Sequence, residues 1–215
     1  MRLSRRDGDT GEADQRVSEA LRAYARGTGS ERAALAALAA SRLLVPIVAV
    51  LAGANEDGTE KESEMALPTL IGNDGRKAVI AFTGIESLRR WKDDARPVPV
   101  PAHRVWAAAL GEADAVVIDV AGPVPLAVEG ARLRALASGE PPPLPHEDPD
   151  IRAEVAAVTS GFTLAPGGGD ADLAITLETA DMDHARAMAR QIAFRLSARC
   201  RRGIQIRTSC PNARA

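Results

Sequence analysis

The most regular pattern of apolar and polar positions lies in residues 64–84, EMALPTLIGNDGRKAVIAFTG. Two apolar runs flank the polar turn Asn73-Asp74-Gly75, and these residue types tolerate the positive φ angles that tight hairpin turns require. The pattern predicts two strands, 65–72 and 76–82. Because their interiors carry no His, Cys or acid, we interpret the hairpin as the centre of a sheet and not as an active site.

The segments around this hairpin alternate between helical and strand patterns. Apolar residues spaced three and four apart predict helices, and short apolar runs rich in β-branched residues predict buried strands. Pro46 interrupts the first such run, which indicates an edge position or a bulge. Thr83 is expected to cap the helix that follows the hairpin. The predicted helices are 16–26, 31–42, 84–91, 103–113 and 129–138; the predicted strands are 43–51, 115–120 and one within 122–128; and RPVPVP (96–101) is expected to be extended.

A proline-rich stretch, GEPPPLPHEDPD (139–150), follows these elements and is typical of a stiff linker. Beyond it, the pattern predicts a helix (151–159), strands 162–166 and 172–179, a long helix (183–201) and a strand (203–208). We therefore predict an α+β fold. A mixed β-sheet N-terminal domain flanked by helices (16–138) is joined by a linker (139–149) to a small α/β C-terminal module (150–208), with a disordered tail at 1–15 and a second tail at 209–215.

Composition narrows the functional classes. The chain has 215 residues, of which 46% are hydrophobic and 3% aromatic, so a core of small aliphatic side chains is expected. The longest apolar run, residues 43–54, is too short for a membrane helix, and no secretory signal is recognised. We expect a cytoplasmic protein with no membrane partner. The net charge of −2 conceals eight arginines and no acid after Asp183, which leaves the first 183 residues at about −10.

Three motifs resemble a known family. EMALPTLIGNDGRKAVIAFTGIESLRRW, then ARPVPV and VVIDVAGPVPLAVEG, are similar to the SseB family of bacterial proteins, in the form found in high-GC Gram-positive bacteria. The resemblance runs from about Val17 to Leu136. It implies an α/β protein of the cytoplasm, and the family's name, taken from an enhanced serine sensitivity phenotype, implies a connection with amino-acid metabolism or its regulation. It supplies no catalytic residue and no cofactor.

Cys200 is the candidate nucleophile. It begins CRRGIQ, which superficially resembles the loop of rhodanese-like sulfurtransferases, yet the strand pattern IQIRT leads the chain away from the sulfur. Arg207 arrives one position too late for a Cys-x5-Arg phosphate loop. Cys200 also continues the apolar stripe of its predicted helix at spacings of four, which favours a buried thiol. If the thiol were exposed, the neighbouring arginines would lower its pKa.

The arginines of the same helix are candidate anion ligands. Arg186, Arg190 and Arg201 share one flank of the predicted helix and could hold a small anionic metabolite or an acidic protein surface. The alternative is a solvated face whose arginines pair within the chain, for example with the acidic loop 56–64. Nucleic acid is not favoured as a partner, because the chain is acidic and offers few aromatic platforms.

Asp119 ends the predicted strand AVVIDV, a position that open α/β sheets often use for ligands. The alternative is an acid that bonds its own turn. The loop PGGGDAD (166–172) has no helix directly behind it and is interpreted as a hairpin loop. His103, His146 and His184 lie in unrelated settings, so no metal site is predicted, and no cofactor is proposed.

Two functional hypotheses follow from these residues. The favoured one is a non-enzymatic binding or regulatory protein that holds a protein partner or a small anionic metabolite. The alternative is a thiol-dependent enzyme of sulfur or amino-acid metabolism that uses Cys200 as its nucleophile. The exposure of Cys200 distinguishes the two, because a nucleophilic thiolate needs access to substrate.

Overall fold

The computed structural model describes residues 9–47, 69–72 and 75–210. Helices and mixed sheets occur together, which confirms the α+β class. The helices are α1 (Gln15–Ala25), α2 (Glu31–Ala39), α3 (Ile85–Trp91), α4 (Ala102–Glu112), α5 (Gly130–Ala137), α6 (Pro149–Ala156) and α7 (Met182–Leu196). The strands are β1 (Arg42–Ile47), β2 (Thr69–Ile71), β3 (Lys77–Ala81), β4 (Arg96–Pro101), β5 (Ala115–Ile118), β6 (Leu126–Glu129), β7 (Phe162–Pro166), β8 (Leu173–Glu178) and β9 (Ile204–Ser209).

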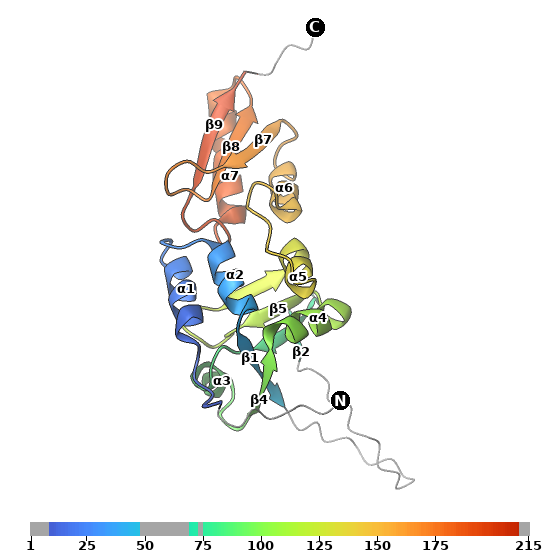
Figure 1. Cartoon of the computed structure of the whole chain (residues 1–215). Coiled ribbons are helices and arrows are strands. Elements are labelled where there is room, and N and C mark those ends of the chain that lie inside the picture. Colours follow the sequence, from blue (N-terminus) through green and yellow to red (C-terminus); the bar gives the residue numbers. More distant parts are fainter. Residues whose placement is uncertain (1–8, 48–68, 73–74, 211–215) are drawn as a thin grey trace, which may run out of the picture.

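The described strands form three sheets in an elongated molecule (Figure 1). The first part of the chain, up to the end of α5, contains a four-stranded sheet of order β2-β3-β5-β6 and a two-stranded β1-β4 ribbon. In the larger sheet, β3 and β5 run parallel. The ribbon joins the larger sheet through a bridge between Leu44 and Phe82. The third sheet, β7-β8-β9, lies with α6 and α7 at the other end of the molecule.

The predicted hairpin is present, but only one of its strands is central. β2 pairs antiparallel with β3, with Thr69 opposite Val79. Among the described strands, β3 is an inner strand, whereas β2 lies at the edge of the sheet and its Ile71 is exposed. Residues 65–68, 73 and 74 lie outside the described residues. The interpretation of the hairpin as sheet centre therefore holds for β3 and is wrong for β2.

After its exposed first residue, Lys77, the inner strand β3 is apolar because both faces of its sheet are covered. Successive side chains of a strand point to opposite faces. Val79 and Ala81 join the core under α1, α2, α4 and α5, while Ile80 and Phe82 join a second cluster with α3 and β1. Both faces thus exclude water, which explains a continuous apolar run in place of an alternating one.

Proline shapes the β1-β4 ribbon. The two strands pair antiparallel from Arg42 opposite Pro101 to Ile47 opposite Arg96, which confirms the extended segment 96–101. Pro46 lies opposite Pro97 in this ribbon, in agreement with the predicted edge position. Every second residue of β4 is proline, and proline has no N–H to donate. The ladder bonds that β4 donates to β1 therefore come from the residues between its prolines.

The described residues from Asp9 to Gln15 differ from the prediction of a disordered tail at 1–15. From Asp9 onward the chain packs on the domain: Arg42 Nε lies 2.7 Å from Asp9 Oδ2, and the Ile85 N–H donates to the Gly11 carbonyl at 2.7 Å. Asp14 then caps α1 by accepting from the Arg16 N–H. Polar anchors, which hydropathy patterns do not register, hold this segment.

The start of α3 also differs from its prediction. Its N-cap is Gly84, and no side chain caps the helix. The Thr83 hydroxyl donates instead to the Asp119 carboxylate at 2.6 Å. A tertiary partner has therefore replaced the local cap that the sequence suggested.

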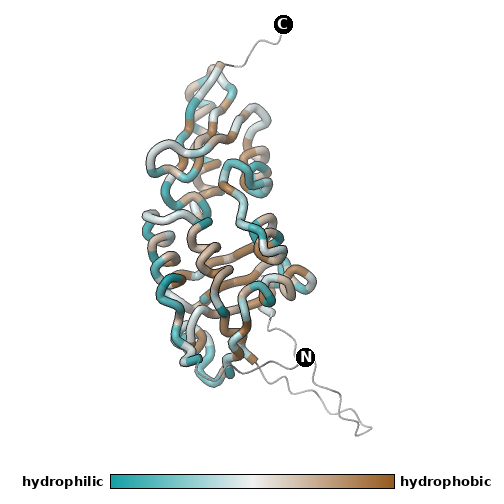
Figure 2. The backbone as a smooth tube through the Cα atoms, viewed as in Figure 1, coloured by the Kyte–Doolittle hydropathy of each residue, from teal (hydrophilic) through white to brown (hydrophobic). Residues whose placement is uncertain are grey.

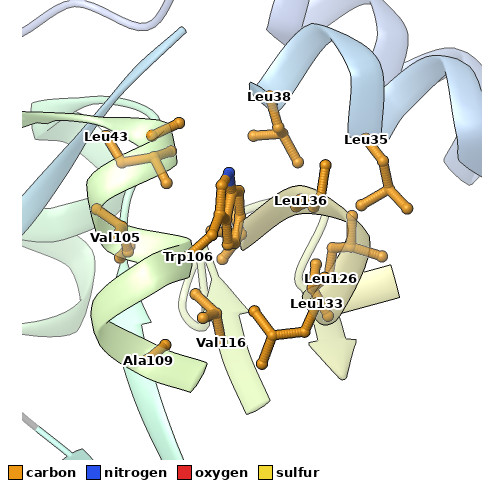
Figure 3. Close-up of a cluster of buried hydrophobic side chains, with 14 of the residues drawn as sticks. Leu35, Leu38, Leu43, Val105, Trp106, Ala109, Val116, Leu126, Leu133 and Leu136 are labelled. Carbon is orange, nitrogen blue, oxygen red and sulfur yellow. The ribbon is translucent and has the colours of Figure 1, made fainter. Parts of the chain in front are cut away.

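The buried side chains fall into groups that do not cross the proline-rich segment 139–148. In the first part, Trp106 lies among leucines and valines from the sheet and from α2, α4 and α5 (Figure 3). In the second part, α7 packs on β8 through Met188, Ile192 and Leu196. Apolar stretches run mainly along the inside of each part in Figure 2. The two parts consequently meet through other kinds of contact.

Candidate functional site

A buried ionic network joins the two parts of the chain; we call it the ionic clamp. Arg132 Nη1 on α5 lies 2.5 Å from Glu31 Oε1 on α2. Arg199, just after α7, reaches Glu31 Oε2 at 3.2 Å and Asp148 Oδ2 at 2.6 Å. Asp148 is fully buried and Glu31 nearly so. Burial opposes the charge of Arg199, but the two carboxylates outweigh it and raise the pKa of the guanidinium.

Further polar contacts surround the clamp. The Tyr24 hydroxyl on α1 donates to the Ala198 carbonyl, and the Arg201 guanidinium lies 5.1 Å from the centre of the Tyr24 ring. Gly27, with φ of 69°, leaves room for the Arg201 carbonyl, which an added Cβ would approach to 2.7 Å. Interfaces dominated by polar contacts permit relative motion of the parts they join.

A cleft of about 630 Å³ lies between the two parts, and we call it the arginine cleft. Its charged lining residues are Arg76, Arg132, Arg195, Arg199, Arg201, Glu31, Glu129, Asp150 and Glu154. The four carboxylates are all committed: Glu31 in the clamp, Glu129 to Arg76 at 2.5 Å, Glu154 to Arg195 at 2.9 Å and Asp150 to Arg134 at 3.9 Å. Arg201 forms no ion pair with a carboxylate of the described residues. The lining therefore carries one surplus positive charge, at Arg201.

The three arginines predicted to share a flank are separated. α7 ends at Leu196 and not at residue 201, so Arg201 lies beyond the helix and enters the arginine cleft. Arg186 pairs with Asp183 at 2.9 Å on the exposed surface, and Arg190 is also exposed; neither lines the cleft. The acidic loop 56–64, the suggested mate of these arginines, lies outside the described residues.

Asp119 lies in a second hollow of about 330 Å³, the sheet-end pocket, at the carboxyl ends of β3 and β5. Its backbone has φ of 49°, and its carboxylate accepts from the Thr83 N–H at 2.9 Å and from the Thr83 hydroxyl at 2.6 Å. Burial raises the pKa of Asp119. The carboxylate thus binds the turn after the neighbouring strand and not, as the alternative had it, its own turn.

Cys200 lies inside the C-terminal core. The residue is 5% exposed, and burial, with a contribution from Asp172, raises the pKa of its thiol to about 12. It borders a shallow hollow near Gly27. However, the next amides point elsewhere, because Arg202 N–H donates to Asp172 at 2.9 Å and Gly203 N–H to the Cys200 carbonyl at 3.1 Å. No ring of amides stabilises a thiolate here.

The remaining candidates have structural surroundings. The glycine-rich loop joins β7 to β8, and the Gly168 backbone exchanges hydrogen bonds with the Gln205 side chain. Phe194 on α7 is 82% exposed, and the rest of the described chain does not cover it. Within the described ranges, no three His, Cys, Asp or Glu side chains are grouped closely enough to hold a metal ion.

Sequence reasoning missed the residues that build the clamp. Glu31 reads as an ordinary first-turn acid of α2, and Asp148 as the N-cap of α6, which it also is. Arg132 lies in a short helix where an arginine normally faces water. One signal was available in the sequence: arginines lie among the apolar positions of α5. This signal does not identify the partner of Arg132.

The fold and its hollows define a class: an α+β protein with a mixed four-stranded sheet, a pocket at the ends of its parallel strands and an arginine-lined cleft beside its second core. Residues 17–135, more than half of the chain, match the family model of the SseB protein N-terminal domain. The chain therefore belongs to the SseB family, as the motifs indicated. No curated protein and no solved structure gave a significant match.

The family match helps to divide the two hollows. Most of the sheet-end pocket, from Ser18 to Val124, falls within the matched residues, whereas Arg199 and Arg201 of the arginine cleft lie beyond them. Among the described residues, no helix combines the length and apolarity needed to cross a bilayer.

Proposed function

We propose that this protein is a non-enzymatic binding protein whose arginine cleft holds a small organic anion bearing a carboxylate or a phosphate. The observation that carries this proposal is Arg201, which lines the cleft with no carboxylate partner in the described part of the chain. The four acids of the described lining already have arginine partners, so an incoming anion would meet a guanidinium that none of them neutralises.

Two further features support an anion at this position. The Tyr24 ring lies under the Arg201 guanidinium, and such stacking restricts the side chain before a ligand arrives. The volume of about 630 Å³ falls within the range of small-molecule sites. Because residues from both parts of the chain line the cleft, a bound anion would favour one position of the two parts relative to each other. Binding could regulate the protein through this shift between conformations.

The wider setting of this function follows the family. We take the domain division at residues 139–149, a cytoplasmic location and a connection with serine sensitivity as parts of the same proposal, and metabolites of amino-acid metabolism are the first anions to test. The buried thiol with its raised pKa gives no support to the alternative of an enzyme acting through Cys200.

Isothermal titration calorimetry with a panel of carboxylates and phosphate esters tests the proposal, with succinate and inorganic phosphate as the simplest members. Arg201→Gln should weaken the binding of the best anion about 10- to 100-fold, which is the usual effect of a lost charge-assisted hydrogen bond. Arg190→Gln, an exposed arginine of α7 outside the cleft, is the matched control and should leave affinity unchanged. Equal affinities in the two variants, or no binding by any anion, would refute the proposal.

A further inference from the structure

Asp119 is a buried carboxylate without a cation. The residue is 4% exposed, and the hydrogen bonds that its carboxylate accepts from the described residues come from neutral donors: the Thr83 N–H, the Thr83 hydroxyl and the Ser87 hydroxyl. No Arg, Lys or His of the described residues forms an ion pair with it. Removing a carboxylate from water without an opposite charge carries a large free-energy penalty. The other buried acids of the described residues, Glu31 and Asp148, both have arginine partners, so Asp119 alone among them bears this penalty.

The position itself is one where α/β proteins bind ligands. Asp119 follows β5 directly, and its partner Thr83 lies just after β3, the parallel neighbour of β5. The crevice outside the carboxyl ends of parallel strands is the usual ligand position in open sheets. Asp119 is also the one non-glycine residue of the described chain with positive φ, and such strained residues concentrate at binding sites.

The walls of the sheet-end pocket supply the opposite charge at its exposed side. Arg22 on α1 lines the pocket, is exposed, and forms no ion pair with a carboxylate of the described residues. The other arginine of the lining, Arg90, is engaged with Glu86 at 2.5 Å. Hydroxyl groups of Ser18 and Ser87 and the exposed carboxylate of Glu12 also line the pocket. The pocket therefore has an unpaired anion at its buried end and an uncommitted cation at its surface.

We propose that the sheet-end pocket binds a small zwitterion, with a primary ammonium group against the Asp119 carboxylate and a carboxylate toward Arg22. The ammonium provides the charge that Asp119 lacks, and its three N–H groups suit the carboxylate oxygens and the neighbouring hydroxyls. A volume of about 330 Å³ admits a molecule of a few heavy atoms up to a free amino acid. This pocket shares no lining residue with the arginine cleft, so the inference is independent of the proposed anion site.

The test is a titration with glycine and alanine as zwitterions, ethanolamine as the amine without an acid, and acetate as the acid without an amine. The zwitterions should bind, ethanolamine should bind at least several-fold more weakly, and acetate should not bind in this pocket. Equal binding of acetate and glycine by the Arg201→Gln variant, which lacks the proposed ligand of the arginine cleft, would overturn the ammonium assignment. Ethanolamine that binds as tightly as glycine would overturn the role of Arg22.

Variants assign the binding to the pocket. Asp119→Asn keeps the size of the side chain and a residue type that tolerates positive φ, and should weaken glycine at least 10-fold. Arg22→Gln, on an exposed helix face, should weaken glycine several-fold and leave ethanolamine unchanged, so the proposal stays testable if the first variant folds poorly. Arg190→Gln, exposed on α7 and outside both hollows, is the control and should bind glycine as the parent does. Unchanged affinity in both Asp119→Asn and Arg22→Gln would overturn the proposal.

Discussion

Replacement of Glu31 by glutamine tests the ionic clamp. Glu31 receives Arg132 on one oxygen and Arg199 on the other, with side chains that are 5% and 15% exposed. Glutamine keeps the shape but removes the charge, so both guanidiniums lose their shared anion. Arg132 is then left with the Ala127 carbonyl at 3.4 Å and Glu129 at 3.9 Å, while Arg199 keeps Asp148 at 2.6 Å.

The expected loss follows from these distances. Removal of one partner of a buried ion pair typically costs about 3–5 kcal/mol. Because Arg199 retains a short bond to Asp148, we expect the lower end, about 3 kcal/mol. That is a large fraction of the roughly 5–15 kcal/mol by which a domain is stable. With an m-value of about 2 kcal/mol per molar urea, the unfolding midpoint should fall by roughly 1.5 M.

Urea unfolding followed by two signals provides the assay. Both tryptophans of the chain, Trp91 and Trp106, belong to the first part, so their fluorescence reports that part alone, while far-UV circular dichroism reports helices of both. In Glu31→Gln the dichroism transition should begin at lower urea than the fluorescence transition, because the clamp joins the parts. Glu86→Gln, in an exposed pair with Arg90, is the control and should stay within about 0.5 kcal/mol of the parent. A Glu31→Gln curve that matches this control would refute the reasoning.

Further predictions concern Gly27 and Cys200. Gly27→Ala should lower the free energy of unfolding in urea by about 1–2 kcal/mol, because an alanine is strained at φ of 69° and its Cβ would lie 2.7 Å from the Arg201 carbonyl. The control is Gly111→Ala, where an added Cβ meets nothing within 4 Å, and it should not destabilise the protein. Equal losses in the two variants would contradict this account. Iodoacetamide at neutral pH should modify the exposed Cys210 and leave Cys200 unmodified until the protein unfolds; rapid double labelling, read by mass spectrometry, would contradict its burial. Burial raises the pKa of Cys200 to about 12, so from about pH 9 upward only the unfolded thiol ionises and stability should decline, an effect that Cys200→Ala should reduce.

Local patterns predicted most of the helices and strands because the helices bury one face and the inner strand β3 buries both, and each case leaves a recognisable apolar pattern. The run RKAVIAF identified β3, and the spacing of apolar residues identified α4 and α7. The patterns could not show that β2 lies at an edge, since the order of strands depends on which segments meet later in folding. They also missed the ordered residues from Asp9 onward, which polar contacts to Arg42 and Ile85 hold in place.

The sites were predictable only in part. Asp119 was identified from its place at the end of a strand, and the burial of Cys200 from its helical stripe. The arginines were misplaced because the long helix ends at Leu196, one turn earlier than its pattern indicated. A partner such as Glu31 lies 168 positions from Arg199, and neither residue type nor spacing connects two charges so far apart.

The alternating prolines of β4 have a consequence for self-association. Since Pro97, Pro99 and Pro101 cannot donate to β1, the residues between them do so, and the outer rim of this ribbon presents carbonyl groups without amide donors. A strand from a neighbouring molecule would find acceptors but no donors there and could not extend the sheet. Within the described part of the chain, the outer edge of β4 therefore disfavours aggregation by strand addition.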